Sequence, residues 1–176
     1  MFLALILLVP VAGIAVFLIY VAQRPSEFRV ARSLAISAPA PVAFAQVNEL
    51  HRWQSWSPWE GVDPDLKRTY EGPAKGVGAK YSWEGAKTGA GTMTITQSRE
   101  PAVIGIDLEF LKPFKATNAV EFTFQPSGES TLVSWIMTGK DTFGMKAVSL
   151  LINRDKMCGD MFEQGLAKLK AVCESA

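Results

Sequence analysis

The stretch that decides the fold lies near the C-terminus and reads AVSLLINRDKMCGDMFEQGLAKLKAV, residues 147–172. Its apolar or small residues recur at intervals of three and four, the spacing that places side chains on one face of a helix. The residues on this face are Val148, Leu151, Ile152, Cys158, Met161, Phe162, Gly165, Leu166, Leu169 and Val172. The pattern predicts one amphipathic helix whose apolar face packs against the rest of the chain.

One charged residue, Asp155, falls on that apolar face between Leu151 and Phe162. A charge on a buried face needs a partner. Two interpretations stay open. In the first, Asp155 caps a break in the helix or pairs with Arg32 or Arg154. In the second, it faces a cavity, where desolvation raises its pKa and suits it to hydrogen-bond a ligand or to act as a weak candidate general acid/base. In either case we expect Leu151 and Phe162 to be buried.

The composition indicates a globular domain and excludes several classes of protein. The chain has 176 residues, of which 48% are hydrophobic and 20% charged, enough apolar material for one packed core. Its net charge is +1, without a run of like charges, so a nucleic-acid partner is not expected. With His51 as the only histidine, the sequence predicts no metal site and no cofactor. Cys158 and Cys173 would lie roughly 22 Å apart on one helix, too far for a disulfide.

The N-terminal segment from Phe2 to Ala22 contains no charged residue. About 20 apolar residues in a helix span the hydrocarbon core of a bilayer, so the segment predicts a single-pass membrane anchor. A cleaved signal peptide is the alternative, but no basic residue follows Met1 and no small-residue cleavage site follows the apolar run. Arginines follow the span and none precedes it, which favours the cytoplasmic side for the C-terminal domain.

These boundaries divide the chain into three parts. We expect the anchor over residues 1–23, a linker over 24–27 and one folded domain over 28–174. The membrane is thus an expected partner through residues 2–22.

Between the anchor and the final helix the pattern predicts mainly strands. Apolar and polar residues alternate from Phe28 to Ser37, a helix is expected over 42–50, and a short second helix or a turn over 51–55. Six further strands are predicted at 67–71, 78–84, 91–98, 103–111, 117–125 and 131–139. Their short connections imply antiparallel pairing. The fold class is therefore α+β, with a curved seven-stranded antiparallel sheet wrapped around the C-terminal helix.

Three tryptophans, Trp53, Trp56 and Trp59, fall within one short segment before the second strand. Such a cluster forms either a plug of aromatic packing or a wall of a ligand cavity, and both interpretations stay open.

The acidic residues Asp107, Glu109 and Glu121 alternate with apolar residues, so we expect them on the outer face of the sheet. A reversed register would instead place all three in the cavity. His51 is expected at the surface or in a capping role, with acid/base chemistry as the alternative. The glycines from Gly85 to Gly91 lack the spacing of a phosphate or dinucleotide loop and predict hairpin turns.

Several stretches together resemble the START-like superfamily, and more narrowly its polyketide cyclase/dehydrase-related (SRPBCC) bacterial branch, which includes members with an N-terminal membrane anchor. The stretches are residues 36–44, 53–59, 76–83, 91–95 and 155–166. The resemblance implies the helix-grip fold and a cavity between sheet and C-terminal helix that binds lipids, sterols, polyketides or other apolar molecules. It implies no catalytic residue, because the superfamily shares no catalytic constellation.

These observations lead to one expected function and two alternatives. We expect a membrane-tethered domain that binds a hydrophobic small molecule or lipid. The alternatives are an enzyme of the cyclase or dehydratase kind acting on a polyketide-like or aromatic substrate, and a protein-interaction module at the membrane. The expected ligand-binding residues are Trp56, Trp59, Tyr81, Trp83, Phe110, Phe122, Trp135, Met137, Leu151, Asp155 and Phe162.

Overall fold

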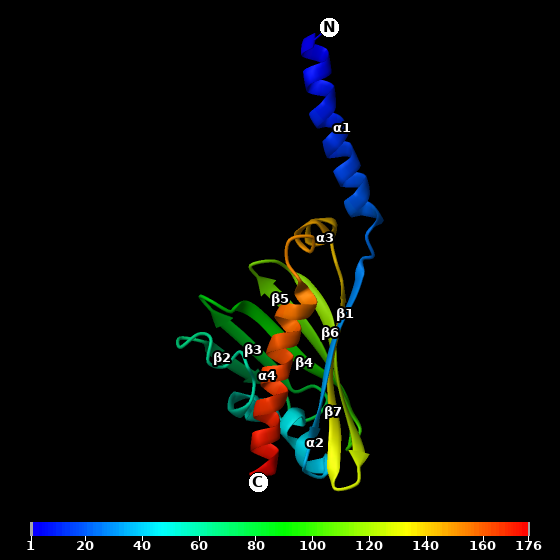
Figure 1. The fold of residues 1–176 in the computed structure, drawn as a ribbon. Helices are drawn as coiled ribbons and strands as arrows, with labels where there is room; N and C mark the ends of the chain where they lie inside the picture. Colours follow the sequence, from blue (N-terminus) through cyan, green and yellow to red (C-terminus); the bar gives the residue numbers. More distant parts are fainter. Residues whose placement is uncertain (1, 176) are drawn as a thin grey trace.

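The computed structural model describes the backbone of residues 2–175 and the side chains of residues 12–175. Seven strands form one antiparallel sheet in the order β1-β7-β6-β5-β4-β3-β2 (Figure 1). Strands β2 to β7 each pair with the next strand in the sequence, and β1 pairs with β7. The strands are β1 (Glu27–Ile36), β2 (Lys67–Glu71), β3 (Lys80–Gly85), β4 (Gly89–Arg99), β5 (Val103–Lys112), β6 (Ala116–Ser127) and β7 (Ser130–Lys140). The predicted seven-stranded antiparallel sheet is confirmed.

Helices cover one face of this sheet and one of its ends. They are α1 (Phe2–Gln23), α2 (Ala40–Asn48), the 3₁₀ helix η1 (Leu50–Ser55), α3 (Phe143–Val148) and α4 (Arg154–Glu174). In Figure 1, α4 crosses the sheet, α2 lies near the C-terminal end of α4, and α1 projects from the opposite end beyond α3. The long helix and the curved sheet enclose the core between them.

Alternation along the strands decides which side chains enter that core. On β6, Val120, Phe122 and Phe124 are buried, whereas Glu121 between them is exposed. Asp107 and Glu109 on β5 are exposed in the same way. The prediction that the three acids lie on the outer face is confirmed, because successive side chains of a strand point to opposite faces.

The prediction of one helix over residues 147–172 is wrong. The chain forms α3, then a turn over residues 149–153, and then α4. Asn153 caps α4: its side-chain oxygen accepts a hydrogen bond from the backbone N–H of Lys156 at 3.0 Å. An asparagine in this position competes with helix continuation, since it satisfies an N–H that the first turn leaves free.

The break also changes the burial of the residues before it. Phe162 is buried as predicted, but Leu151 lies in the turn and is 90% exposed, so the prediction that it is buried is wrong. A turn interrupts the rotation of about 100° per residue, and the residues on its two sides therefore no longer share a face.

The N-terminal helix tests the predicted anchor only in part. The first half of the predicted span, residues 2–11, lies outside the residues whose side chains the structure describes. Over the described part of the chain, no helix is both long enough and apolar enough to cross a membrane. The transmembrane helix is therefore not confirmed.

Candidate ligand-binding cavity

A cavity of about 300 Å³ lies between the sheet and the N-terminal half of α4. Its wall is formed by the segment around η1, by strands β3 to β7, and by α4. The lining residues are Trp53, Ser57, Trp59, Glu60, Leu66, Tyr81, Trp83, Thr88, Met93, Leu108, Phe110, Val120, Trp135, Met137, Met157, Cys158 and Phe162. Most of them are apolar or aromatic, and a cavity of this size and lining is typical of small-molecule sites.

An aromatic stack joins α4 to the sheet at the floor of this cavity. The rings of Trp135 on β7 and Phe162 on α4 are parallel, with centroids 4.3 Å apart. Trp59 meets Trp135 edge-on at 5.5 Å and is partly exposed at the rim. Gly165 permits the close approach of α4, because a Cβ there would lie 2.8 Å from Cζ3 of Trp135. This packing forms one wall of the cavity, and such aromatic pairs add stability beyond the area that they bury.

The structure brings seven of the predicted ligand-binding residues together around the cavity. These are Trp59, Tyr81, Trp83, Phe110, Trp135, Met137 and Phe162. Two others, Trp56 and Phe122, do not line it, because both are fully buried in the core behind the wall. The indole N–H of Trp56 donates to the backbone oxygen of Gln46 at 3.2 Å, which fixes its ring in that position.

The tryptophan segment therefore has both of the roles left open by the sequence. Trp53 and Trp59 line the cavity, whereas Trp56 is packed beneath it. The indole N–H of Trp53 donates to the backbone oxygen of Val47 at 2.9 Å, which ties the segment to α2.

Asp155 does not line the cavity. Its carboxylate accepts hydrogen bonds from the Arg32 guanidinium at 3.2 and 3.1 Å, and its side chain is 62% exposed. The hydrogen bond from Arg32 lowers the pKa of Asp155, the reverse of the rise expected for a desolvated acid. Arg32 also donates to Glu163 at 2.7 Å. The pairing with Arg32 is confirmed, and Asn153 rather than Asp155 caps the helix.

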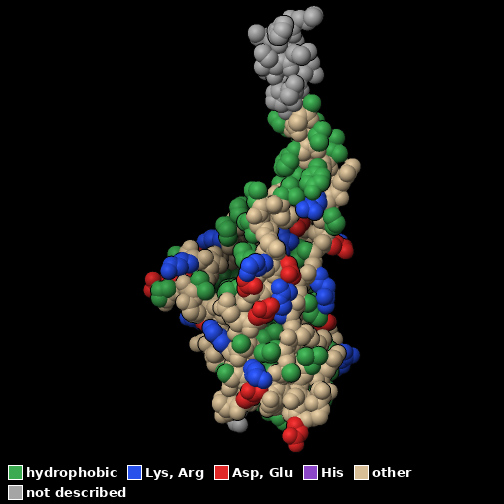
Figure 2. All heavy atoms as spheres, viewed as in Figure 1, with side chains coloured by type: hydrophobic (Ala, Val, Ile, Leu, Met, Phe, Trp, Pro, Cys, Tyr) green, Lys and Arg blue, Asp and Glu red, His purple; other side chains and the backbone are tan. Residues whose placement is uncertain are grey.

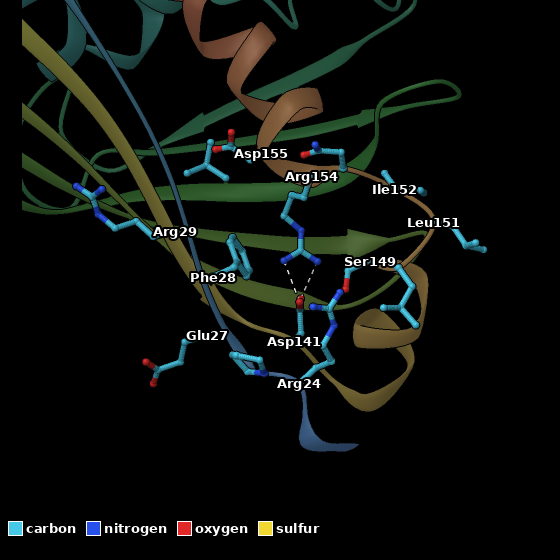
Figure 3. Close-up of a pocket in the computed structure, with 14 residues that line it drawn as sticks. Arg24, Glu27, Phe28, Arg29, Asp141, Ser149, Leu151, Ile152, Arg154 and Asp155 are labelled. Atoms are coloured by element: carbon cyan, nitrogen blue, oxygen red, sulfur yellow. Dashed lines mark hydrogen bonds and ion pairs between the residues drawn. The ribbon is translucent and has the colours of Figure 1, made fainter. Parts of the chain in front are cut away.

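A second hollow, of about 490 Å³, lies where α1 and β1 meet the turn between α3 and α4. Asp155 and Leu151 are on its border, and we call it the junction hollow (Figure 3). The figure shows its main feature, a two-pronged ion pair between Arg154 and Asp141. The guanidinium nitrogens lie 2.7 and 3.0 Å from the Asp141 oxygens, and the guanidinium carbon lies 4.1 Å from the centroid of the Phe28 ring.

Sequence reasoning missed Glu60, the one charged residue that residues 12–175 contribute to the cavity wall. Its side chain is only 12% exposed and pairs with Arg68, whose Nε and Nη2 lie 2.8 and 2.6 Å from Oε2. The hydroxyl of Tyr81 donates to the other oxygen, Oε1, at 3.3 Å. Glu60 lies in an irregular loop, where no alternation predicts a direction; its position directly after Trp59 is the only signal.

Titratable groups around the cavity are held in their neutral or paired forms. Burial, with the charge of Glu60 as a smaller cause, raises the pKa of Tyr81, so its phenol stays protonated. Burial also raises the pKa of Cys158 in the wall, and it raises the pKa of Cys173 further along α4 to about 11. Such thiols behave as small apolar groups rather than as nucleophiles.

Two buried polar atoms of cavity-lining residues have no hydrogen-bond partner within the described part of the chain. They are Nε1 of Trp135 and the hydroxyl oxygen of Thr88. The predicted hairpin turn after Gly85 is confirmed, since the chain turns there between β3 and β4. The turn predicted at Gly89 to Gly91 is wrong, because these residues begin strand β4 and pair with β3. His51 lies at the surface, as one interpretation of the sequence predicted, and stacks on Tyr70 with ring centroids 3.7 Å apart.

Among the side chains of residues 12–175, no group of three His, Cys, Asp or Glu is placed to hold a metal ion.

Comparisons with known proteins agree with this architecture. Residues 27–174 match the family described as "Polyketide cyclase / dehydrase and lipid transport". A search of curated proteins found no match.

Solved structures show the same fold at low sequence identity. Protein CV1439 from Chromobacterium violaceum is 16% identical, with a TM-score of 0.61 over 86% of this chain and 99% of that chain. The Aha1 protein from Colwellia psychrerythraea, solved as a dimer, is 12% identical, with a TM-score of 0.60 over 84% of this chain and 96% of that chain. The di-domain ARO/CYC StfQ from the steffimycin biosynthetic pathway is 12% identical, with a TM-score of 0.62 over 85% of this chain and 51% of that chain. These structures confirm the predicted fold, and the family match over residues 27–174 supports the predicted resemblance.

Proposed function

Because this chain belongs to the polyketide cyclase/dehydrase and lipid transport family, we propose that it binds a hydrophobic small molecule or lipid in the cavity between the sheet and α4. The observation that carries the proposal is the cavity of about 300 Å³ with its aromatic and aliphatic wall. Transfer of apolar surface from water into such a wall contributes about 25 cal/mol per Å². An apolar ligand therefore gains binding energy over most of its surface.

The test compares what the purified full-length chain and two tryptophan variants carry. Met93→Trp places a large side chain in the cavity wall on β4, whereas Leu132→Trp adds the same side chain to an exposed position on β7. Solvent extraction and mass spectrometry should find a bound apolar molecule in the wild type and in Leu132→Trp, and much less in Met93→Trp. Equal amounts in all three proteins would show that the molecule sits outside the cavity, and no molecule in any of them would count against the proposal.

The proposal includes a membrane tether through residues 2–22, with the domain on the cytoplasmic side. Support comes from the lack of charges in this segment and from exposed apolar side chains at the end of the domain from which α1 departs. These side chains are Phe114, Phe143, Leu151 and Ile152. The turn with Phe114 shares this end with α3, because the start of β6 pairs with the end of β7. Figure 2 shows hydrophobic side chains gathered where α1 meets α3.

Cell fractionation tests the tether separately from ligand binding. The full-length chain should stay in the membrane pellet after an alkaline wash, and a chain without residues 2–22 should not. Protease added to intact cells should leave the domain uncut if it lies on the cytoplasmic side. Recovery of the full-length chain in the supernatant would rule out the tether and leave the ligand proposal standing.

A cyclase- or dehydratase-like reaction is the second candidate, and one observation favours it. Glu60 forms an ion pair with Arg68 and accepts a hydrogen bond from the Tyr81 hydroxyl in the cavity wall. Carboxyl and phenol groups are among the side chains that act as general acids and bases on a bound substrate. The extracted molecule, incubated with the ligand-free protein, should then change in mass, for example by the loss of water, and Glu60→Gln should stop the change.

A further inference from the structure

Glu60 is the one charged side chain among the described residues that line the cavity. Its countercharge lies behind the wall: Arg68 is not a lining residue, and its Nε and Nη2 both donate to Oε2 of Glu60. The remaining terminal nitrogen, Nη1, donates to the backbone oxygen of Leu66 at 3.0 Å. All three guanidinium nitrogens thus donate to groups of the protein, and the described lining residues present a carboxylate but no cation to the cavity.

The second oxygen of Glu60 is less fully used. Within the described part of the chain, its only hydrogen bond comes from the Tyr81 hydroxyl at 3.3 Å, which is longer than the usual 2.5 to 3.0 Å for a bond between oxygens. A carboxylate oxygen accepts about two hydrogen bonds. Oε1 therefore has acceptor capacity left, and it belongs to the one charged side chain among the described residues of a mostly apolar wall.

We propose that the cavity selects apolar alcohols or phenols, whose hydroxyl donates to Oε1 of Glu60, and rejects carboxylic acids of the same shape. The inference rests on the proposed function, since it assumes that the cavity takes an apolar ligand. The hydroxyl of such a ligand supplies a hydrogen-bond donor to the free acceptor position of Oε1. A hydrogen bond to a charged group is stronger than one between neutral groups. A ligand carboxylate would lose its water, find no unpaired cation and lie near a like charge.

Three ligands of one shape test the selection: naphthalene, 2-naphthol and 2-naphthoate. Their binding to the full-length chain at pH 7 is measured by displacement of the neutral fluorescent probe N-phenyl-1-naphthylamine, with Met93→Trp giving the background of probe outside the cavity. We expect 2-naphthol to bind about tenfold more tightly than naphthalene, and 2-naphthoate to bind at least about tenfold more weakly than 2-naphthol.

Glu60→Gln should reverse the selection. The substitution keeps the shape of the side chain but leaves Arg68 without its carboxylate. The affinity for 2-naphthoate should therefore rise about tenfold or more, while the affinity for naphthalene stays unchanged. The matched control is Glu84→Gln, which removes an exposed carboxylate paired with Lys112 outside the cavity and should change nothing. If Glu60→Gln fails to fold, the double variant Glu60→Gln with Arg68→Met removes both charges. This variant should lose the preference for 2-naphthol over naphthalene, and its affinity for 2-naphthoate should not rise.

The outcomes separate the two proposals. Equal binding of 2-naphthol and 2-naphthoate to the wild type, or an unchanged ratio in Glu60→Gln, would overturn the selection by Glu60 while binding of naphthalene still supports an apolar cavity. Failure of the probe and of all three ligands to bind the wild type would overturn the proposed function, and the selection with it.

Discussion

The two hollows beside the start of α4 differ in how their polar groups are used. At the junction hollow, Arg154 and Asp141 satisfy each other through two contacts, and both side chains are mostly buried, 18% and 10% exposed. In the cavity, the pairing of Glu60 with Arg68 leaves one carboxylate oxygen weakly bonded, and Trp135 keeps a buried N–H without a partner among the described residues.

The junction hollow has the larger volume, about 490 against 300 Å³, yet its central polar groups, Arg154 and Asp141, already pair with each other. Polar groups that already pair with each other have few hydrogen bonds left for a ligand. An apolar wall with a few unpaired polar atoms provides both apolar contact area and hydrogen bonds that orient the ligand. Volume alone is therefore a poor guide to which hollow binds a ligand. Charges of both signs also gather over the start of α4 in Figure 2, where Arg32 pairs with Asp155 and Glu163.

The largest difference in stability between variants at the two hollows is expected from removing the aromatic ring that α4 contributes to the cavity. Phe162→Ala should lower the free energy of unfolding by about 3–5 kcal/mol, because it removes a buried ring and leaves a void against Trp135. Leu151→Ala at the junction hollow is the control and should cost less than about 0.5 kcal/mol, since Leu151 is exposed. Urea unfolding monitored by circular dichroism measures both. Similar losses for the two variants would mean that the turn packs more tightly than the structure shows.

A smaller effect is expected from breaking the ion pair at the junction hollow. Arg154→Met should cost about 2 kcal/mol, because it leaves the Asp141 carboxylate mostly buried without its cation. The double variant Arg154→Met with Asp141→Leu should recover most of that loss. Probe binding in the cavity should stay as in the wild type. A loss of probe binding in Arg154→Met would show that the two hollows are coupled.

A pH-dependent effect is expected from Asp63, which is buried and fixes the turn next to the cavity. Its carboxylate accepts hydrogen bonds from the backbone N–H groups of Lys87 at 2.9 Å and Asp65 at 3.2 Å, and the bond from Lys87 is the largest cause of a lowered pKa. A lowered pKa in the folded state contributes stability above the unfolded value, about 3.9, and this stability is lost as pH falls through the folded pKa.

The corresponding variant is Asp63→Asn. It should be less stable than the wild type at pH 7 and pH 5, and the difference should shrink below about pH 4 as the wild-type carboxyl becomes protonated. Urea unfolding across this range measures the difference. A gap that stays constant down to pH 3 would mean that the ionised form of Asp63 adds no stability.

The smallest effect is expected from Asp155→Asn. The carboxylate is mostly exposed and lies outside the cavity, so probe binding and ligand content should not change. Since Arg32 lowers the pKa of Asp155, any stability that the pair adds is present above the unfolded pKa of about 3.9 and lost at lower pH. A marked loss of bound ligand in this variant would return Asp155 to the candidate site.

Much of the fold followed from local pattern. Alternation placed Glu121 outside the sheet and Phe122 inside it, because the period of a strand is two and one face is buried. The spacing of three and four placed Phe162 and Leu166 in the core, and both are buried.

The candidate site followed less well, because the same pattern describes a filled core and a cavity wall. Trp56 and Trp59 belong to one motif, yet Trp56 packs in the core and Trp59 lies at the rim of the cavity. Only the packing of the segment after η1 against β7 and α4 separates them. Glu60 was missed because an irregular loop has no periodicity from which the direction of a side chain can be read.

The stretch from residue 147 to 172 shows both what the sequence predicts and what it does not. By itself the sequence determined that its second half is an amphipathic helix with Phe162 buried, since helical periodicity is a local property. Only the tertiary structure decided that the stretch breaks at residues 149–153, that Asp155 pairs with Arg32, and that a cavity remains beside Phe162. These features depend on which groups far apart in the chain meet, and on how completely they fill the space between them.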